Sequence, residues 1–167
     1  DFSTLEINDV INTTLSYQCS NICITGGEPL LQLDQTVYLT EKLIKVDKKV
    51  ILETAGHRQP PDIFENSNTI VSMDCKCPSS GMDLKSDLKN LIQLKPKDQI
   101  KFVIADNDDY IFARNTVKQN PFRAEIIFQP VYGHGISEIA DAVIKDKLKV
   151  RVLPQLHKDI WGDIKGV

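Results

Sequence analysis

The sequence lacks several features that would place the chain in a broad functional class. It contains no apolar run near the roughly 18 residues of a membrane span and no signal-peptide segment. It also lacks an excess of one charge, because 20 basic residues stand against 23 acidic ones and the formal net charge is −3. We therefore expect neither a polybasic nucleic-acid surface nor an acidic tail, and we expect no nucleic-acid or membrane partner.

Methionine is missing from the first position. The chain begins with Asp1, and its methionines are Met73 and Met82. We expect either that processing removed residues or that the natural chain is longer at this end. The four cysteines are interpreted as free thiols of a reduced, cytoplasmic protein.

The residues that are present predict a single α/β domain. A chain of 167 residues is about one domain long, and 41% apolar residues supply a core. Predicted strands begin 20 to 31 residues apart, which favours βα units in a parallel sheet over hairpins. These strands are Asn21–Thr25, Lys49–Glu53, Thr69–Asp74, Ile100–Ile104, Glu125–Gln129 and Lys149–Leu153.

Helical patterns fill the gaps between the predicted strands. Ser3 with Glu6 predicts a capping box for a first helix, and Asp34 is expected to cap a second. Further helices are predicted over Asp83–Leu94 and after the acidic run Asp106–Asp109, where negative charge favours a helix N-terminus. The architecture is then an open doubly wound sheet or a partial barrel, with function at the carboxyl ends of the strands.

The sharpest segment follows the first predicted strand. Gly26 and Gly27 allow a tight turn and close approach of a ligand to the backbone, and Glu28 supplies a carboxylate for an ammonium group. Neither a dinucleotide fingerprint nor a P-loop is present, because G-x-G-x-x-G and Gly-Lys-Ser/Thr are both absent. Polar residues also follow the other strands: Glu53, Thr54, Gly56, Asp74, Lys76, Gln155 and His157.

These strand ends carry a family resemblance. The run TGGEPLLQ at 25–32 resembles the S-adenosylmethionine-binding turn of radical SAM enzymes. The likeness continues in order through ETAG at 53–56, DCKCPSSG at 74–81, DQIKFVI at 98–104, FQPV at 128–131 and PQLHK at 154–158. Taken together, the chain resembles the 7-carboxy-7-deazaguanine synthase family.

The resemblance implies a role for each matching position. Gly26, Gly27 and Glu28 would hold the methionyl amino group of S-adenosylmethionine, and Asp74 and Lys76 would contact its ribose and carboxylate. No catalytic residue and no metal ligand is assigned. Substrate-binding roles are implied for Glu53, Thr54, Gly56, Gln155, His157 and the terminal Val167.

The family's reaction is a ring contraction of 6-carboxy-5,6,7,8-tetrahydropterin to 7-carboxy-7-deazaguanine with loss of ammonia. It serves biosynthesis of 7-deazaguanine nucleosides of the queuosine and archaeosine type. The resemblance implies S-adenosylmethionine, a [4Fe–4S] cluster, Mg²⁺, a reducing electron donor and a cytoplasmic homodimer. It also implies a partial (β/α)6 barrel, here expected to lack its first βα unit.

One family motif has no counterpart in the sequence. The cluster-binding C-x₃-C-x₂-C should precede residue 1, and Cys19 with Cys23 cannot replace it because Gly26 stands at the third position. A composite site of these two cysteines with Cys75 and Cys77 is an alternative. We expect residues 1–167 alone not to turn over.

Two other functional interpretations stay open at this point. The chain is alternatively another radical SAM enzyme, of the activating-enzyme type, that shares the Gly-Gly-Glu-Pro turn. It is alternatively a cluster-less remnant or subunit that binds a nucleoside-like ligand.

Overall fold

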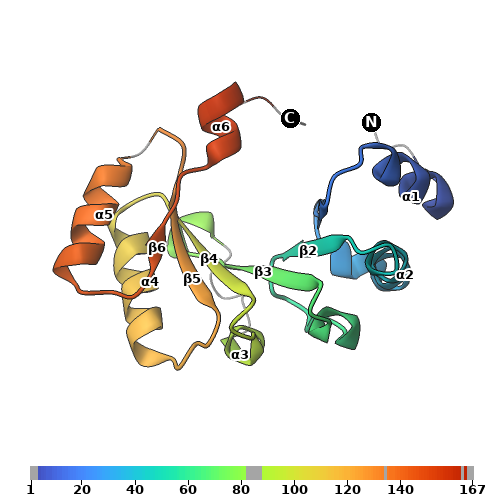
Figure 1. Cartoon of the computed structure of the whole chain (residues 1–167). Coiled ribbons are helices and arrows are strands. Elements are labelled where there is room, and N and C mark those ends of the chain that lie inside the picture. The colour runs from blue at the N-terminus through green and yellow to red at the C-terminus, as the bar shows by residue number, and fades with distance from the viewer. Residues whose placement is uncertain (1–3, 82–87, 134, 163, 165–167) are drawn as a thin grey trace. The chain divides into compact units, whose positions relative to one another are not determined.

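The computed structural model describes residues 4–81, 88–133, 135–162 and 164 (Figure 1). These residues form six parallel strands that alternate with helices, which confirms the predicted α/β class. The chain divides into two compact units, Asp1–Thr54 with Arg58–Ser72 and Ala55–His57 with Met73–Val167. In the described part of the chain, no helix is both long and apolar enough to cross a membrane.

In the first unit, β1 (Asn21–Ile24) pairs in parallel with β2 (Lys49–Thr54), and Ile22 stands opposite Val50. The core of this unit is largely aliphatic, with Leu30, Leu43, Val50 and Leu52 fully buried and Phe64 4% exposed. Its helical elements are α1 (Ile7–Ser16), η1 (Pro29–Gln32), α2 (Leu33–Ile44) and η2 (Asp62–Glu65), and β3 (Thr69–Cys75) begins here.

The second unit contains the end of β3 and three strands that pair in chain order. β4 (Gln99–Ile104) pairs with β5 (Glu125–Pro130), and β5 pairs with the short β6 (Arg151–Val152). Figure 1 shows α4 and α5 together on one side of these strands. The helical elements are η3 (Pro78–Ser80), α3 (Leu88–Gln93), α4 (Asn107–Gln119), α5 (Ile136–Lys145) and α6 (Leu156–Trp161).

Aromatic packing fills the core of the second unit. Phe102 and Phe128 are fully buried, and their rings meet edge to face with centroids 5.6 Å apart. Tyr110 of α4 meets Phe128 in the same manner at 6.0 Å. These contacts attach α4 to β4 and β5, so the beginning of α4 is held close to the carboxyl end of β4.

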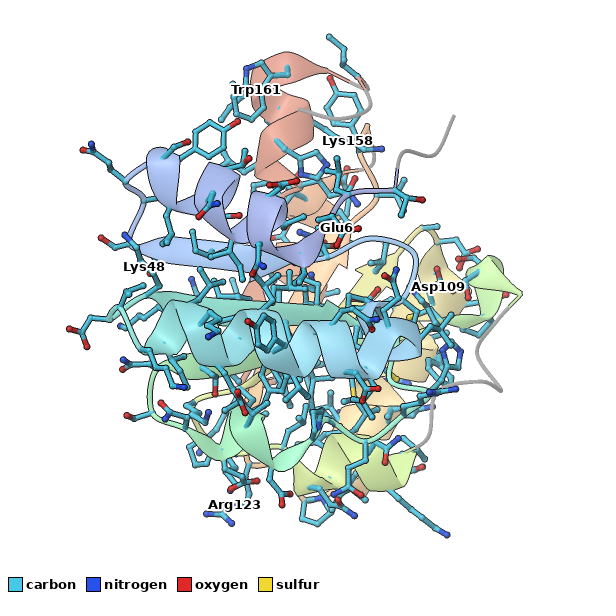
Figure 2. All side chains as sticks on the ribbon, turned by 90° about the vertical axis from the view of Figure 1, so that its right-hand side faces the viewer. Glu6, Lys48, Asp109, Arg123, Lys158 and Trp161 are labelled. Carbon is cyan, nitrogen blue, oxygen red and sulfur yellow. The ribbon has the colours of Figure 1, made fainter. Side chains whose placement is uncertain are left out.

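The structure differs from both cap predictions. Glu6, labelled in Figure 2, is the N-cap of α1 and makes no side-chain cap, so the capping box led by Ser3 is wrong; Ser3 itself lies outside the described residues. Asp34 sits inside α2, whose N-cap is Gln32, because η1 leads directly into this helix. α4 begins at Asn107, inside the acidic run Asp106–Asp109, and the side chain of Asp106 caps it by accepting the N–H of Asp109 at 2.9 Å.

Candidate functional site

The turn after β1 holds a carboxylate in a defined position. Glu28 is extended at the N-cap of η1, and its Oε1 accepts the N–H of Leu30 at 3.1 Å. The hydroxyl of Thr54 donates to both oxygens of Glu28, at 2.8 and 2.9 Å. Thr54 is 4% exposed, whereas Glu28 is half-buried. These hydrogen bonds therefore fix the orientation of the Glu28 carboxylate, and within this unit part of it stays accessible to a ligand.

The two glycines before Glu28 leave room beside that carboxylate. Gly26 has a φ of +139°, which side chains rarely adopt, so glycine is needed there for the backbone conformation. A Cβ at Gly26 or Gly27 would meet no heavy atom of the described residues within 4 Å. Open space next to exposed backbone is what the close approach of a ligand requires.

Glu53 borders the same turn. It is half-buried at the end of β2, and its Oε2 accepts the hydroxyl of Thr25 at 3.3 Å. The parallel register that pairs Ile24 with Leu52 brings these two side chains together. The first unit thus brings together five of the predicted positions: the two glycines, Glu28, Glu53 and Thr54.

In the second unit, the end of β3 presents an ion pair. The ammonium of Lys76 lies 2.6 Å from Oδ2 of Asp74. Lys101 of β4 approaches Oδ1 of the same carboxylate at 3.9 Å, and its side chain is 16% exposed. Asp74 therefore lies between two cations of this unit, one just after β3 and one on β4.

Lys101 was not singled out by sequence reasoning. Its position alternates with the buried Ile100 and Phe102, so it lies on the opposite face of β4. The sequence did contain a signal for Lys101: it is a charged residue that alternates with apolar residues inside a predicted strand.

Gly56 is buried and has a φ of +79°. A Cβ there would lie 3.0 Å from Cγ of Met73, and Asn90 donates to the Gly56 carbonyl at 3.0 Å. Packing and backbone conformation both demand glycine at this position, and its predicted contact with substrate stays a prediction.

The last predicted site segment lies between β6 and α6. Oε1 of Gln155 accepts the N–H of Tyr132 at 3.3 Å, which joins the segment to the loop after β5. His157 is exposed on α6, near Lys158 and Trp161, which Figure 2 labels. The prediction for Val167 falls outside the described residues.

The cysteines do not form a cluster site. Cys19 and Cys23 are exposed in the first unit, whereas Cys75 and Cys77 are each 2% exposed in the second. Burial, and then the charge of Asp74, raises the pKa of the Cys75 thiol to about 12, and burial likewise raises the pKa of Cys77. Thiolates are the ligands of iron–sulfur clusters, so buried neutral thiols are poorly suited to hold one.

The same conclusion follows from grouping the metal-binding side chains. Among the described residues, no three His, Cys, Asp or Glu side chains are placed to hold a metal ion. This part of the chain therefore does not fit a [4Fe–4S] cluster.

Comparison with known proteins places the chain in a family. A protein of Methanospirillum hungatei JF-1 is 38% identical over 156 residues, which cover 93% of this chain and 65% of that protein. Proteins of Thermoplasma acidophilum (36% identity, 87% and 69% coverage) and Koribacter versatilis (38%, 86% and 70%) match similarly. All three are named 7-carboxy-7-deazaguanine synthase. The chain belongs to the 7-carboxy-7-deazaguanine synthase family.

A solved structure agrees with the synthase fold. The crystal structure of QueE from Escherichia coli matches with a TM-score of 0.63 and 21% identity, covering 90% of this chain and 64% of that one. No model of a known protein family matches the sequence. The chain spans slightly less than two thirds of the Methanospirillum synthase and of the QueE structure.

Proposed function

We propose that this chain contributes the S-adenosylmethionine-binding strand ends of a 7-carboxy-7-deazaguanine synthase. The observation that carries the proposal is the oriented carboxylate of Glu28 beside Gly26 and Gly27. Membership of the synthase family supports S-adenosylmethionine as the ligand.

Glu28 would bind the methionyl ammonium group of S-adenosylmethionine. A carboxylate that already accepts from a hydroxyl and a backbone N–H keeps further lone pairs for a cation. Thr54 holds the carboxylate so that little side-chain entropy is lost on binding. The glycines would let the ligand reach backbone N–H and C=O groups.

Asp74 and Lys76 would bind the ribose and the carboxylate of the same cofactor. An ionised Asp accepts from ribose hydroxyls, and a Lys ammonium pairs with a carboxylate. The 2.6 Å ion pair keeps both groups ordered before the ligand arrives. In the whole enzyme, S-adenosylmethionine bound there would supply radical chemistry once a reduced cluster gave it one electron.

The remaining predicted positions would face the substrate, a carboxylated tetrahydropterin. We propose that the end of β2 with the loop after it, and the segment that runs from Gln155 into α6 and on to the C-terminus, carry these contacts. Polar groups that can both donate and accept suit the edges of a polar heterocycle. The residues are Glu53, Thr54, Gly56, Gln155, His157 and Val167.

For the whole enzyme we propose the ring contraction of 6-carboxy-5,6,7,8-tetrahydropterin to 7-carboxy-7-deazaguanine, with ammonia released. It would use S-adenosylmethionine, a [4Fe–4S] cluster, Mg²⁺ and a reducing electron donor, in a cytoplasmic homodimer serving queuosine-type biosynthesis. A partial (β/α)6 barrel of the radical SAM type is the architecture we propose. The described residues offer no group of ligands for the cluster or for Mg²⁺.

The activating-enzyme alternative has less support, because three relatives at 36–38% identity share the synthase name. The remnant alternative also includes binding of a nucleoside-like ligand, but it differs from the synthase proposal in that no reaction is catalysed. Binding and turnover therefore have to be measured separately.

Binding is tested by titrating the 167-residue chain with S-adenosylmethionine in a calorimeter. We expect saturable binding that Glu28→Gln weakens by roughly tenfold or more, since a charge-assisted hydrogen bond is lost. Asp34→Asn, at an exposed position of α2, is the matched control and should bind as the parent chain does. Equal binding by the parent and Glu28→Gln would contradict the role of Glu28, and no binding by the parent would contradict the proposal.

Turnover is tested by anaerobic iron–sulfur reconstitution followed by incubation with the pterin and a reductant. We expect residues 1–167 alone to form no product, because their cysteines do not form a cluster site. Product formation by these residues would show that expectation to be wrong.

A further inference from the structure

We infer that Asp109 is a positioning residue whose carboxylate ties the turn after β3 to the end of β4, and so holds Asp74 and Lys76 in place for S-adenosylmethionine. The inference rests on the proposed function for its ligand. Its structural basis is a buried carboxylate that joins two strand ends of the second unit.

Asp109 is completely buried in the first turn of α4 (Figure 2). Burying a carboxylate is costly unless hydrogen-bond donors surround it. Three donors do so: the N–H of Ser79 at 2.9 Å, the hydroxyl of Ser79 at 2.5 Å and the N–H of Ala105 at 2.9 Å. A charged group that a protein buries and fully partners in this way indicates a specific structural task.

The donors come from the two segments that carry the Asp74 ion pairs. Ser79 belongs to η3, which begins two residues after Lys76. Ala105 directly follows β4, the strand that carries Lys101. One carboxylate therefore connects the segments that place both cations beside Asp74.

The link between Ser79 and Lys76 is short and rigid. The N–H and the hydroxyl of Ser80 both donate to the carbonyl of Cys77, at 3.0 and 2.6 Å. Cys77 itself is 2% exposed, so the segment cannot shift without moving a buried side chain. A displacement of η3 would therefore be passed on to Lys76.

Helix capping does not account for Asp109. The side chain of Asp106 already caps α4 by accepting the N–H of Asp109. The carboxylate of Asp109 instead points out of the helix to η3 and to the end of β4. The hydrogen bond from Ala105 lies next to the N-cap of α4, whereas the two hydrogen bonds from Ser79 join this helix to the separate segment η3.

The test compares Asp109→Asn, Ser79→Ala and Asp108→Asn in the 167-residue chain. The Asn side chain is the same size, but its amide group faces a donor, so we expect roughly tenfold weaker S-adenosylmethionine binding. Ser79→Ala keeps both backbone donors and should weaken binding about threefold. Asp108→Asn changes an exposed residue of the same turn and should have no effect.

A stability control separates positioning from general destabilisation. Val143→Ala removes buried groups from α5 in the same unit and should lower the melting temperature without changing affinity. All titrations are made where each variant is fully folded. Equal affinity of Asp109→Asn and the parent chain, or an equal loss of affinity in Val143→Ala, would overturn the inference.

Hydrogen exchange tests the same bridge without any ligand. Asp109→Asn should speed exchange of the Ser79 and Ala105 amides while β5 stays protected. Unchanged exchange at both amides would count against Asp109. If the parent chain bound no S-adenosylmethionine, the proposed function would be wrong, but hydrogen exchange would still test whether Asp109 holds Ser79 and Ala105. If Asp109→Asn did not fold, Ser79→Ala would be used for both the titration and the exchange measurement.

Discussion

Glu28 and Asp109 use the same hydrogen-bonding chemistry in two different surroundings. Each carboxylate accepts from a hydroxyl and from backbone N–H groups, Glu28 in the first unit and Asp109 in the second. Glu28 is half-buried beside two glycines, whereas Asp109 is completely buried. The surroundings, rather than the partners, distinguish a group able to meet a ligand from one that ties the chain together.

The largest expected difference between the two carboxylates is in stability. Asp109→Ala removes a completely buried carboxylate and leaves the donors of the exposed Ser79 and the half-buried Ala105 without that acceptor, so we expect a loss of about 1.5–3 kcal/mol. Glu28→Ala should cost about 1 kcal/mol, because water can replace the carboxylate. Urea unfolding followed by circular dichroism measures both, and equal losses would break the comparison.

Cys75 is a buried acidic group whose effect on stability should depend on pH. Its folded pKa of about 12 lies above the ordinary thiol value of 9.0, so above about pH 9 the unfolded chain releases a proton that the folded chain keeps. The stability that this thiol contributes is fully present below pH 9. Between about pH 9 and about pH 12 the free energy of unfolding should therefore fall by about 1.4 kcal/mol per pH unit.

Urea unfolding at pH 8 and pH 10 checks this slope. Cys75→Ala should make it shallower, whereas Cys19→Ala, at an exposed position, should leave it unchanged. An identical slope in the parent chain and Cys75→Ala would show that this thiol does not contribute.

Thr54 tests whether Glu28 depends on its buried partner. Thr54→Val removes the donor while preserving the shape of the side chain, and we expect S-adenosylmethionine binding to weaken by about threefold to tenfold, or about 1 kcal/mol. Thr40→Val is the matched control, because Thr40 is buried in the same unit but donates to the Thr36 carbonyl. Calorimetry should show no change of affinity for the control, and a loss equal to that of Thr54→Val would refute the specific role.

The smallest expected effect concerns the glycines beside Glu28. Gly26→Ala forces a side chain onto a φ of +139° and should destabilise the chain by about 1 kcal/mol. Gly27→Ala meets similar open space without that positive φ, so thermal unfolding should shift less. A larger shift for Gly27→Ala would contradict the backbone explanation.

The strands were predictable from local pattern because β-branched runs alternate with turn residues. The predicted Lys49–Glu53 and Thr69–Asp74 each extend by one residue in the structure, as β2 and β3. The short last strand is narrower than predicted, Arg151–Val152 instead of Lys149–Leu153. Strand ends depend on pairing with a neighbour, which local pattern does not contain.

Helix beginnings were less predictable, since several nearby residues can cap and packing selects among them. Asp34 is a good cap by residue type, yet η1 places Gln32 at that position. α1 carries Ile7, Val10 and Ile11 at helical spacing, yet none of its residues is buried. Periodicity predicts which side chains share a face, and not how deeply that face is buried.

The sequence by itself determined the α/β class and the approximate strand positions, and it put Gly26, Glu28, Asp74 and Lys76 at or just after strand ends. These follow from local spacing and from residue types that carry their chemistry wherever they lie. Tertiary structure alone decided that Lys101 shares the carboxylate of Asp74 and that Asp109 is buried between Ser79 and Ala105. Both arrangements depend on contacts between segments far apart in the sequence, which arise only when the strands and helices pack together.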